Sequence, residues 1–235
     1  MTETAESRRE HLVAVFREAS TCTRCGLAET RNTVVFGAGN ADADLMFIGE
    51  APGAEEDRRG LPFVGRAGGL LNELLEGIGL SRESVFIANT LMCRPPGNRD
   101  PQPAELDACR PYLLEKVRLI EPKVIVTLGN FATKLITGNQ TGITRVRGKP
   151  QIHTLGVRTV QVFPILHPAA ALRTPSLRET MNEDFASLAR LLAAPALPQE
   201  AGVAAGPATE DEPKPDGVGA SRRPPEDDQL DIFAP

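Results

Sequence analysis

The sequence lacks any long apolar segment. A helix that crosses a membrane needs about 20 consecutive apolar residues, and no run in these 235 residues approaches that length. The first ten residues are acidic and polar, without the apolar stretch that a secretory signal contains. We therefore expect a cytoplasmic protein, in the nucleoid if its partner is DNA, with no membrane partner.

Cysteine and histidine are also scarce. The chain has four cysteines and three histidines. Four cysteines are too few for a disulfide framework in a chain of this length, so we expect them to be reduced or bound to metal. Hydrophobic residues make up 41% of the chain and charged residues 24%. That composition is ordinary for a globular protein and excludes a wholly disordered chain.

The segment 195–235 differs in composition from the rest of the chain. It contains eight prolines, nine acidic residues and three basic residues, with few large apolar side chains. We therefore predict a disordered acidic tail over 195–235 and one folded domain over 1–194. The tail carries a formal charge of −6 and the folded part +1, so net charge neither favours nor excludes a polyanionic partner.

Short apolar runs alternate with helical patterns along the folded part. The apolar runs predict strands over 45–49, 85–89, 124–128 and 159–163. The helical spacing predicts helices over 6–17, 67–78, 104–120, 130–136 and 176–192. Pro111 is expected to kink or restart the helix that contains it. This alternation indicates a three-layer α/β/α fold with a central four-stranded parallel sheet covered on both faces.

Ligands of such sheets bind at the carboxyl ends of the strands. The four predicted strands end at Gly49-Glu50, Asn89, Gly129 and His167. Asn89 is either a turn former or a group whose amide reads a donor and an acceptor on a planar base. His167 is either a satisfied structural histidine or a catalytic one.

The loop after the first strand contains three further carboxylates and one aromatic residue. Glu55, Glu56 and Asp57 are interpreted mainly as a solvated acidic turn, while Phe63 is either core or a stacking platform. A phosphate-binding loop is excluded here, because the Walker lysine and the G-x-G-x-x-G spacing are absent.

The four cysteines can form one site. Cys22 and Cys25 have the spacing of a chelating pair, and Cys93 and Cys109 would complete a set of four thiolates. Such a set suits either a zinc ion or an iron–sulfur cluster, and the spacing leaves both open. The alternative is that Cys93 and Cys109 are simply small buried residues. A metal here would staple the N-terminal segment to the sheet, a structural role.

Together these signals resemble family 4 uracil-DNA glycosylases. The resemblance covers about residues 12–192 and rests on the four-cysteine spacing and on the following motifs. They are Gly49-Glu-Ala-Pro-Gly53, Pro62-Phe63-Val-Gly-Arg66-Ala-Gly68, Asn89 and His167-Pro-Ala-Ala-Ala-Leu-Arg173. The resemblance implies the fold given above, a [4Fe–4S] cluster on Cys22, Cys25, Cys93 and Cys109, and removal of uracil from DNA for base excision repair.

The resemblance also implies roles for the strand-end residues. An extruded uracil would lie by Gly49 and Ala51 and stack on Phe63. Asn89 would bond the O4 and N3–H edge of the base. His167 would donate to O2 as negative charge develops there. The aspartate that other uracil glycosylases carry is replaced by Ala51, so Glu50 is the first candidate to orient the attacking water and Glu56 the second.

The same resemblance indicates a surface that contacts DNA. Leu172 is interpreted either as a wedge that fills the gap left by the base or as ordinary helix packing. The candidate phosphate contacts, whose alternative is a solvated basic face, are Arg66, Arg145, Arg147, Lys149 and Arg173.

Two rival functions belong to other classes. Some relatives bind uracil-DNA covalently without turnover and carry a histidine after the second strand, but the segment 93–101 has none. That absence favours an enzyme. An iron–sulfur electron carrier is less favoured, because no second redox partner is evident.

The tail ends in a short motif that predicts a partner. Gln229, Leu230, Ile232 and Phe233 resemble the peptide by which bacterial repair proteins dock on the replicative sliding clamp. The alternative is an idle C-terminus. The protein itself is expected to be a monomer.

Overall fold

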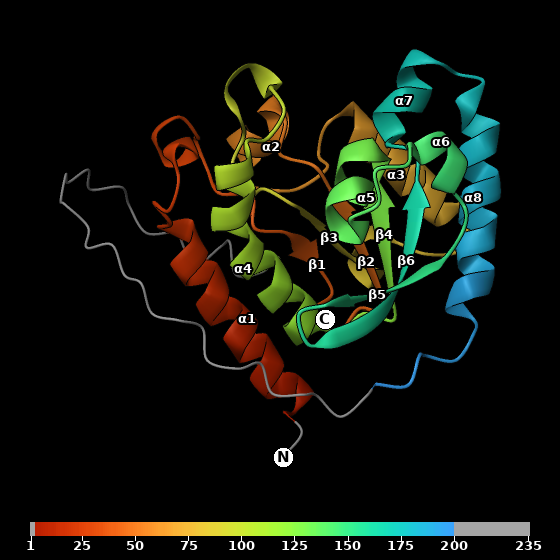
Figure 1. Cartoon of the computed structure of the whole chain (residues 1–235), viewed down its shortest axis with the longest axis horizontal. Helices are drawn as coiled ribbons and strands as arrows, with labels where there is room; N and C mark the ends of the chain where they lie inside the picture. Colours follow the sequence, from red (N-terminus) through yellow and green to blue (C-terminus); the bar gives the residue numbers. More distant parts are fainter. Residues whose placement is uncertain (1–2, 200–235) are drawn as a thin grey trace.

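A mixed sheet of six strands forms the centre of the computed structural model, which describes residues 3–199 (Figure 1). The strand order is β1-β3-β2-β4-β6-β5. The strands are β1 (Ala38–Gly39), β2 (Leu45–Gly49), β3 (Phe86–Asn89), β4 (Val124–Leu128), β5 (Gln151–Leu155) and β6 (Arg158–Ile165). The four central strands β3, β2, β4 and β6 run parallel, as the sequence predicts.

The prediction of only four strands is wrong at both edges of the sheet. β1 pairs antiparallel with β3, and β5 pairs antiparallel with β6. β1 has two residues, too few to show an apolar pattern. β5 carries no fully buried residue, and its Ile152 is 65% exposed. An edge strand that buries so little has no apolar run by which the sequence would reveal it.

Helices cover both faces of the sheet (Figure 1). They are α1 (Ala5–Ser20), α2 (Ala54–Arg59), α3 (Arg66–Glu76), α4 (Pro103–Ile120), α5 (Gly129–Thr137), α6 (Ile143–Val146), α7 (Pro168–Arg173) and α8 (Leu177–Leu192). The five predicted helices are present. The short helices α2, α6 and α7 were not predicted, because none exceeds six residues and none shows a full helical period. α4 continues through Pro111 without restarting, with the proline on its exposed side and Tyr112 and Leu113 buried.

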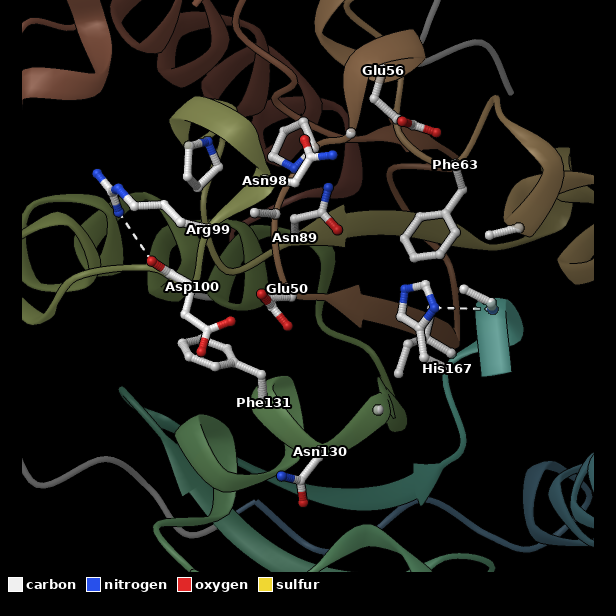
Figure 2. A pocket seen from close by; sticks show the side chains of 18 of the residues that line it. Glu50, Glu56, Phe63, Asn89, Asn98, Arg99, Asp100, Asn130, Phe131 and His167 are labelled. Carbon is white, nitrogen blue, oxygen red and sulfur yellow. Dashed lines mark hydrogen bonds between the residues drawn. The ribbon is translucent and has the colours of Figure 1, made fainter. Parts of the chain in front are cut away.

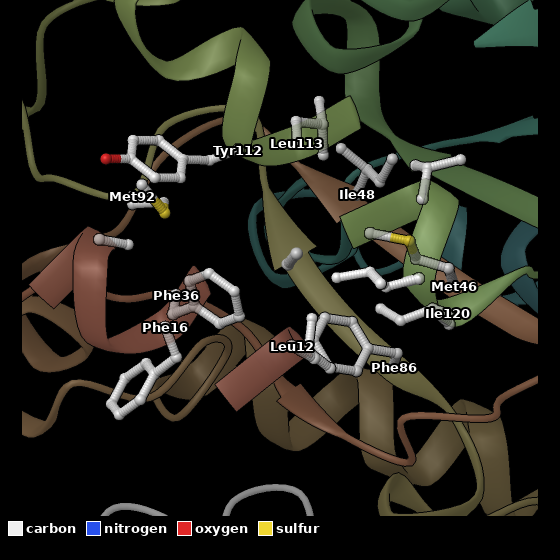
Figure 3. Packing of buried hydrophobic residues seen from close by; sticks show 14 of the residues in the cluster. Leu12, Phe16, Phe36, Met46, Ile48, Phe86, Met92, Tyr112, Leu113 and Ile120 are labelled. Carbon is white, nitrogen blue, oxygen red and sulfur yellow. The ribbon is translucent and has the colours of Figure 1, made fainter. Parts of the chain in front are cut away.

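Alternation along the strands builds two separate cores. Met46 and Ile48 of β2 point to one face and pack in the cluster that includes Leu12 of α1 and Leu113 of α4 (Figure 3). The intervening Phe47 points to the other face, where its ring lies 6.2 Å from that of Phe185 in α8. This period of two makes β2 a fully buried central strand and fixes its carboxyl end at Gly49.

Two further predictions concern membrane-spanning helices and the C-terminal tail. No helix within residues 3–199 is long and apolar enough to cross a membrane. The clamp-like motif and most of the predicted tail lie outside the described residues. The division of the chain at residue 194 stays a prediction.

Candidate active site at the carboxyl edge of the sheet

A cleft of about 780 Å³ opens where the parallel strands end (Figure 2). The structure brings together here the four strand ends singled out in the sequence, and Glu50, Asn89, Gly129 and His167 all line the cleft. Phe63, from the loop between α2 and α3, lines it too. The residues come from distant parts of the chain and meet because parallel strands end at one edge.

Gly49 lies in close contact with the side chains of Asn89 and Phe63, where there is no room for a Cβ atom. A Cβ atom at Gly49 would overlap the side-chain oxygen of Asn89 and lie 2.8 Å from the ring of Phe63. Asn89 is 2% exposed, and its Oδ1 has no hydrogen-bond partner within the described residues. A buried acceptor without a partner is costly. The amide beside the Phe63 ring is therefore built to receive a donor from a ligand.

His167 is held as a neutral hydrogen-bond donor. The main-chain N–H of Ala169 donates to Nδ1 of His167 at 3.1 Å, so the ring proton belongs on Nε2. Burial and, to a lesser extent, the nearby charge of Arg173 lower the pKa of His167 to about 4, while the charge of Glu56 opposes the shift. The imidazole is thus uncharged at neutral pH and keeps one N–H to donate.

The two candidate carboxylates have different surroundings. Glu50 is half-buried and directed into the cleft (Figure 2). Burial raises the pKa of its carboxyl, and the negative charge of Asp100 raises it further. Glu56 instead accepts hydrogen bonds from the main-chain N–H groups of Val64 and Gly65, both at 3.0 Å. Glu50 is directed at the space a ligand would fill, whereas Glu56 secures a loop.

The reading of the acidic turn as solvated is wrong for Asp57. Asp57 is 1% exposed, and its carboxylate accepts from the main-chain N–H of Asn32 at 3.0 Å and from the Asn32 amide at 2.5 Å. Its carboxylate therefore ties α2 to the segment that precedes β1. Glu55 does fit the prediction, since it is exposed and pairs with Arg58.

The sequence reasoning missed several residues of the cleft. Asn98, Arg99 and Asp100 come from the loop between β3 and α4, and Asn130 and Phe131 come from the first turn of α5 (Figure 2). The sequence could have revealed the two residues of α5. A helix that begins directly after a central strand must place its first turn at the carboxyl edge of the sheet. The loop offered no comparable signal.

Comparisons with known proteins show the family of this chain. Residues 36–192 match the family described as the uracil DNA glycosylase superfamily. The chain is 44% identical over 191 residues to the type-4 uracil-DNA glycosylase of Sulfurisphaera tokodaii, covering 79% of this chain and 87% of that protein. It is 46% identical over 186 residues to the type-4 uracil-DNA glycosylase of Archaeoglobus fulgidus, covering 77% and 94%. The corresponding protein of Thermotoga maritima is 46% identical over 182 residues, covering 76% and 93%. The chain belongs to the type-4 uracil-DNA glycosylases.

The four cysteines of this type-4 chain belong to, or pack against, the core cluster that includes Leu12 of α1 and Leu113 of α4. Cys93 and Cys109 are near enough to each other and to Cys25 for the thiols to perturb one another, and Cys22 acts on Cys109 in the same way. Burial raises the pKa of Cys93 to about 11. Arg31 opposes that shift and donates to Sγ of Cys93 at 3.4 Å. The thiols of Cys93 and Cys109 therefore lie near each other and near Cys25, beside the guanidinium of Arg31.

The DNA-contact candidates fall into two groups. Leu172 is 37% exposed in α7, and Arg173 lines the cleft. Arg66, Arg145 and Lys149 are exposed. They stay candidates on the outer surface.

The expectation for Arg147 is not supported, because its guanidinium is engaged inside the fold. It donates to both carboxylate oxygens of Asp184 at 2.9 Å and to the main-chain oxygen of Thr180 at 2.8 Å. Asp184 is 4% exposed. Arg147 therefore joins α6 to α8, and we do not carry it forward as a phosphate contact.

Proposed function

We propose that the cleft at the sheet edge extrudes uracil from DNA and hydrolyses its N-glycosidic bond, leaving an abasic site. As a type-4 uracil-DNA glycosylase the chain is a DNA-repair hydrolase that acts on uracil in DNA. The observation that carries the assignment to this cleft is the buried, unpartnered amide oxygen of Asn89 beside the ring of Phe63. A planar base with a hydrogen-bond donor on its edge can donate to the Asn89 oxygen and stack on the Phe63 ring.

The amide of Asn89 can distinguish uracil from cytosine. The Oδ1 atom accepts from N3–H of uracil, and the Nδ2 atom donates to O4, while Phe63 stacks on the face of the ring. Cytosine presents an acceptor at N3 and an amine at C4, so both hydrogen bonds would be mismatched. A site built to bond one pattern rejects the other strongly, because buried polar groups are left unpaired.

His167 stabilises the leaving base. When the C1′–N1 bond breaks, the electron pair stays with uracil and charge develops on O2. The Nε2–H of neutral His167 donates to that oxygen, which a preorganised donor in a dry site does effectively. Burial keeps the imidazole neutral, with its pKa near 4, so the donor is present throughout the ordinary working range of pH.

Glu50 serves the attacking water. The oxygen of water bonds to C1′ of the sugar, and its proton passes to the carboxylate of Glu50. The same negative charge stabilises the cationic sugar. Ala51 provides no carboxylate at the next position, and Glu56 is already bonded to the amides of Val64 and Gly65, so Glu50 remains the first candidate.

The surface around the cleft engages the DNA strand. Leu172 enters the gap left by the extruded base, as apolar wedges do in other base-flipping proteins. The exposed side chains of Arg66, Arg145, Lys149 and Arg173 contact phosphates. Replacing Leu172 with alanine is expected to weaken binding to duplex substrate more than binding to single-stranded substrate, which a titration with labelled oligonucleotides measures.

The four cysteines hold a [4Fe–4S] cluster. Within residues 3–199 no three His, Cys, Asp or Glu side chains converge closely enough to hold a single ion. The spacing leaves a zinc ion and a cluster both open, and the similarity to type-4 uracil-DNA glycosylases favours the cluster. When bound, the cluster supplies a covalent cross-link between the segment after α1, the loop after β3 and α4. Arg31, which donates to Sγ of Cys93, would offset part of the negative charge of the bound thiolates.

We also propose the replicative sliding clamp as a protein partner through Gln229, Leu230, Ile232 and Phe233, which lie outside the described residues. These apolar side chains are the only clustered ones in a polar tail, and a short peptide of this kind fits a preformed groove. Titration of purified clamp with the tail peptide is expected to give micromolar binding. The same peptide with Leu230→Ala and Phe233→Ala is the control, and equal binding of both peptides would contradict the proposal.

A further inference from the structure

The main chain at Phe63 has an unfavourable conformation. Its φ angle is +51°, in the left-handed region that residues with a side chain rarely adopt. Phe63 is 6% exposed, and its ring lies at the base of the cleft. A strained residue keeps such a conformation only when its surroundings enforce it. The contacts of the neighbouring peptide groups show what enforces it here.

The peptide group between Phe63 and Val64 is held at both ends. Nη1 of Arg82 donates to the main-chain oxygen of Phe63 at 3.0 Å, and Nη2 of the same guanidinium donates to the oxygen of Pro62. On the other side the carboxylate of Glu56 accepts from the N–H of Val64. One cation thus binds two consecutive carbonyls while one anion binds the amide that follows.

A third contact leaves the loop no room to relax. Gly68, in the first turn of α3, packs so closely that a Cβ atom there would overlap the carbonyl group of Phe63. Only a glycine at this position lets α3 approach the loop. The carbonyl of Phe63 is therefore fixed between Arg82 and α3, and the direction of its ring follows from that.

Arg82 also connects the loop to the strand that reads the base. It lies in the short helical turn η2 (Arg82–Ser84), directly before β3, whose last residue is Asn89. The side chain is partly buried, and burial lowers the pKa of its guanidinium, an effect that the charges of Glu83 and Glu56 oppose. A lysine would bring one charge but not the rigid fork of donors that two carbonyls require.

We propose that Arg82 is a positioning residue for the uracil excision described above, acting through Phe63. By fixing the strained peptide at Phe63 it holds the aromatic ring at the correct height over the base that Asn89 reads. The inference rests on the proposed function of the cleft. It adds a residue that never touches the base and that lies 19 positions from Phe63 along the chain.

The first test compares three variants under single-turnover conditions, well below the melting temperature of each. Arg82→Met keeps the aliphatic stem but removes both donors, and the rate constant for uracil release is expected to fall about 10- to 100-fold, as misplacement of a reacting group does. Arg82→Lys is expected to recover part of the loss. Arg8→Met is the matched control, because Arg8 also donates to a main-chain oxygen, that of Leu119 at 3.0 Å, but lies in α1 away from the cleft. It should lower the melting temperature and leave the rate unchanged.

The decisive test is a double-mutant cycle with Phe63→Leu. If Arg82 acts through the ring of Phe63, Arg82→Met should cost less than about threefold in the Phe63→Leu background, because interacting residues are not additive. An equal loss in both backgrounds, or no loss in the wild-type background, would overturn the proposal. The affinity for DNA carrying a non-cleavable uracil analogue, measured on the same proteins, should follow the same pattern. Uracil release by the wild-type protein tests the proposed function by itself. Failure of the proposed function can therefore be distinguished from failure of the proposal for Arg82.

Discussion

The rings of Phe63 and His167 lie against each other at the base of the cleft, with centroids 5.6 Å apart and planes inclined by 30° (Figure 2). The proposed stacking platform and the proposed donor therefore form one unit, although they come from segments that are far apart in the sequence. A base that stacks on Phe63 is brought beside the N–H of His167. In the proposed mechanism, this contact couples recognition of the base to stabilisation of its leaving charge.

Removal of the His167 side chain should affect chemistry far more than binding. His167→Ala is expected to lower the single-turnover rate constant by about two to three orders of magnitude, because one preorganised donor to O2 is lost. The matched control is His153→Ala, since His153 lies in the edge strand β5 away from the cleft. If His167→Ala released uracil at the wild-type rate, the site would be misplaced.

Substitutions of Asn89 should change which base is released. Asn89→Ala is expected to weaken excision of uracil, because N3–H and O4 lose their partners. Asn89→Asp replaces the donor with an acceptor that suits the exocyclic amine of cytosine, so selectivity should shift toward cytosine. Release of each base from matched oligonucleotides measures the ratio. An unchanged ratio in Asn89→Asp would contradict the reading of the amide.

The acid limb of the pH profile should belong to Glu50 and not to His167. The pKa of His167 is lowered to about 4, so its neutral form persists well below the usual range of histidine. Burial and Asp100 raise the pKa of Glu50 above its ordinary value of 4.5, so the rate should fall as pH falls through that raised value and the carboxylate gains a proton.

Asp100→Asn separates the two groups. Removing the negative charge beside Glu50 favours the ionised form, so the acid limb should move to lower pH. Single-turnover rates measured from pH 4 to 8 test this, with Glu10→Gln as control because Glu10 is exposed in α1, outside the cleft. If the acid limb of the pH profile did not move in Asp100→Asn, the group that titrates there would be one other than Glu50.

The metal content should identify the occupant of the cysteine site. Aerobically purified protein is expected to be brown and to hold about four irons per chain, since four thiolates are available. Cys25→Ser should lose iron and solubility before it changes the chemistry of the cleft. Colourless protein with one zinc per chain would refute the cluster.

The sequence predicted those parts of the site that follow from periodicity. The apolar runs located the central strands, and the rule that ligands bind at their carboxyl ends brought Gly49, Asn89 and His167 together. Arg82 was missed because its role depends on main-chain carbonyls, which leave no trace in the sequence. Asp57 was taken for a solvated carboxylate and Arg147 for a phosphate contact, because Asn32 and Asp184, to which they bond, are distant from them in the chain.

The central claim is tested most directly by counting uracil. Purified protein is incubated with an excess of oligonucleotide that contains a single uracil, and released uracil and denaturation-resistant adduct are both measured. The account predicts several moles of free uracil per mole of protein, with an abasic product that alkali cleaves and no adduct. An adduct that survives denaturation at one mole per mole of protein, with no free uracil, would contradict it.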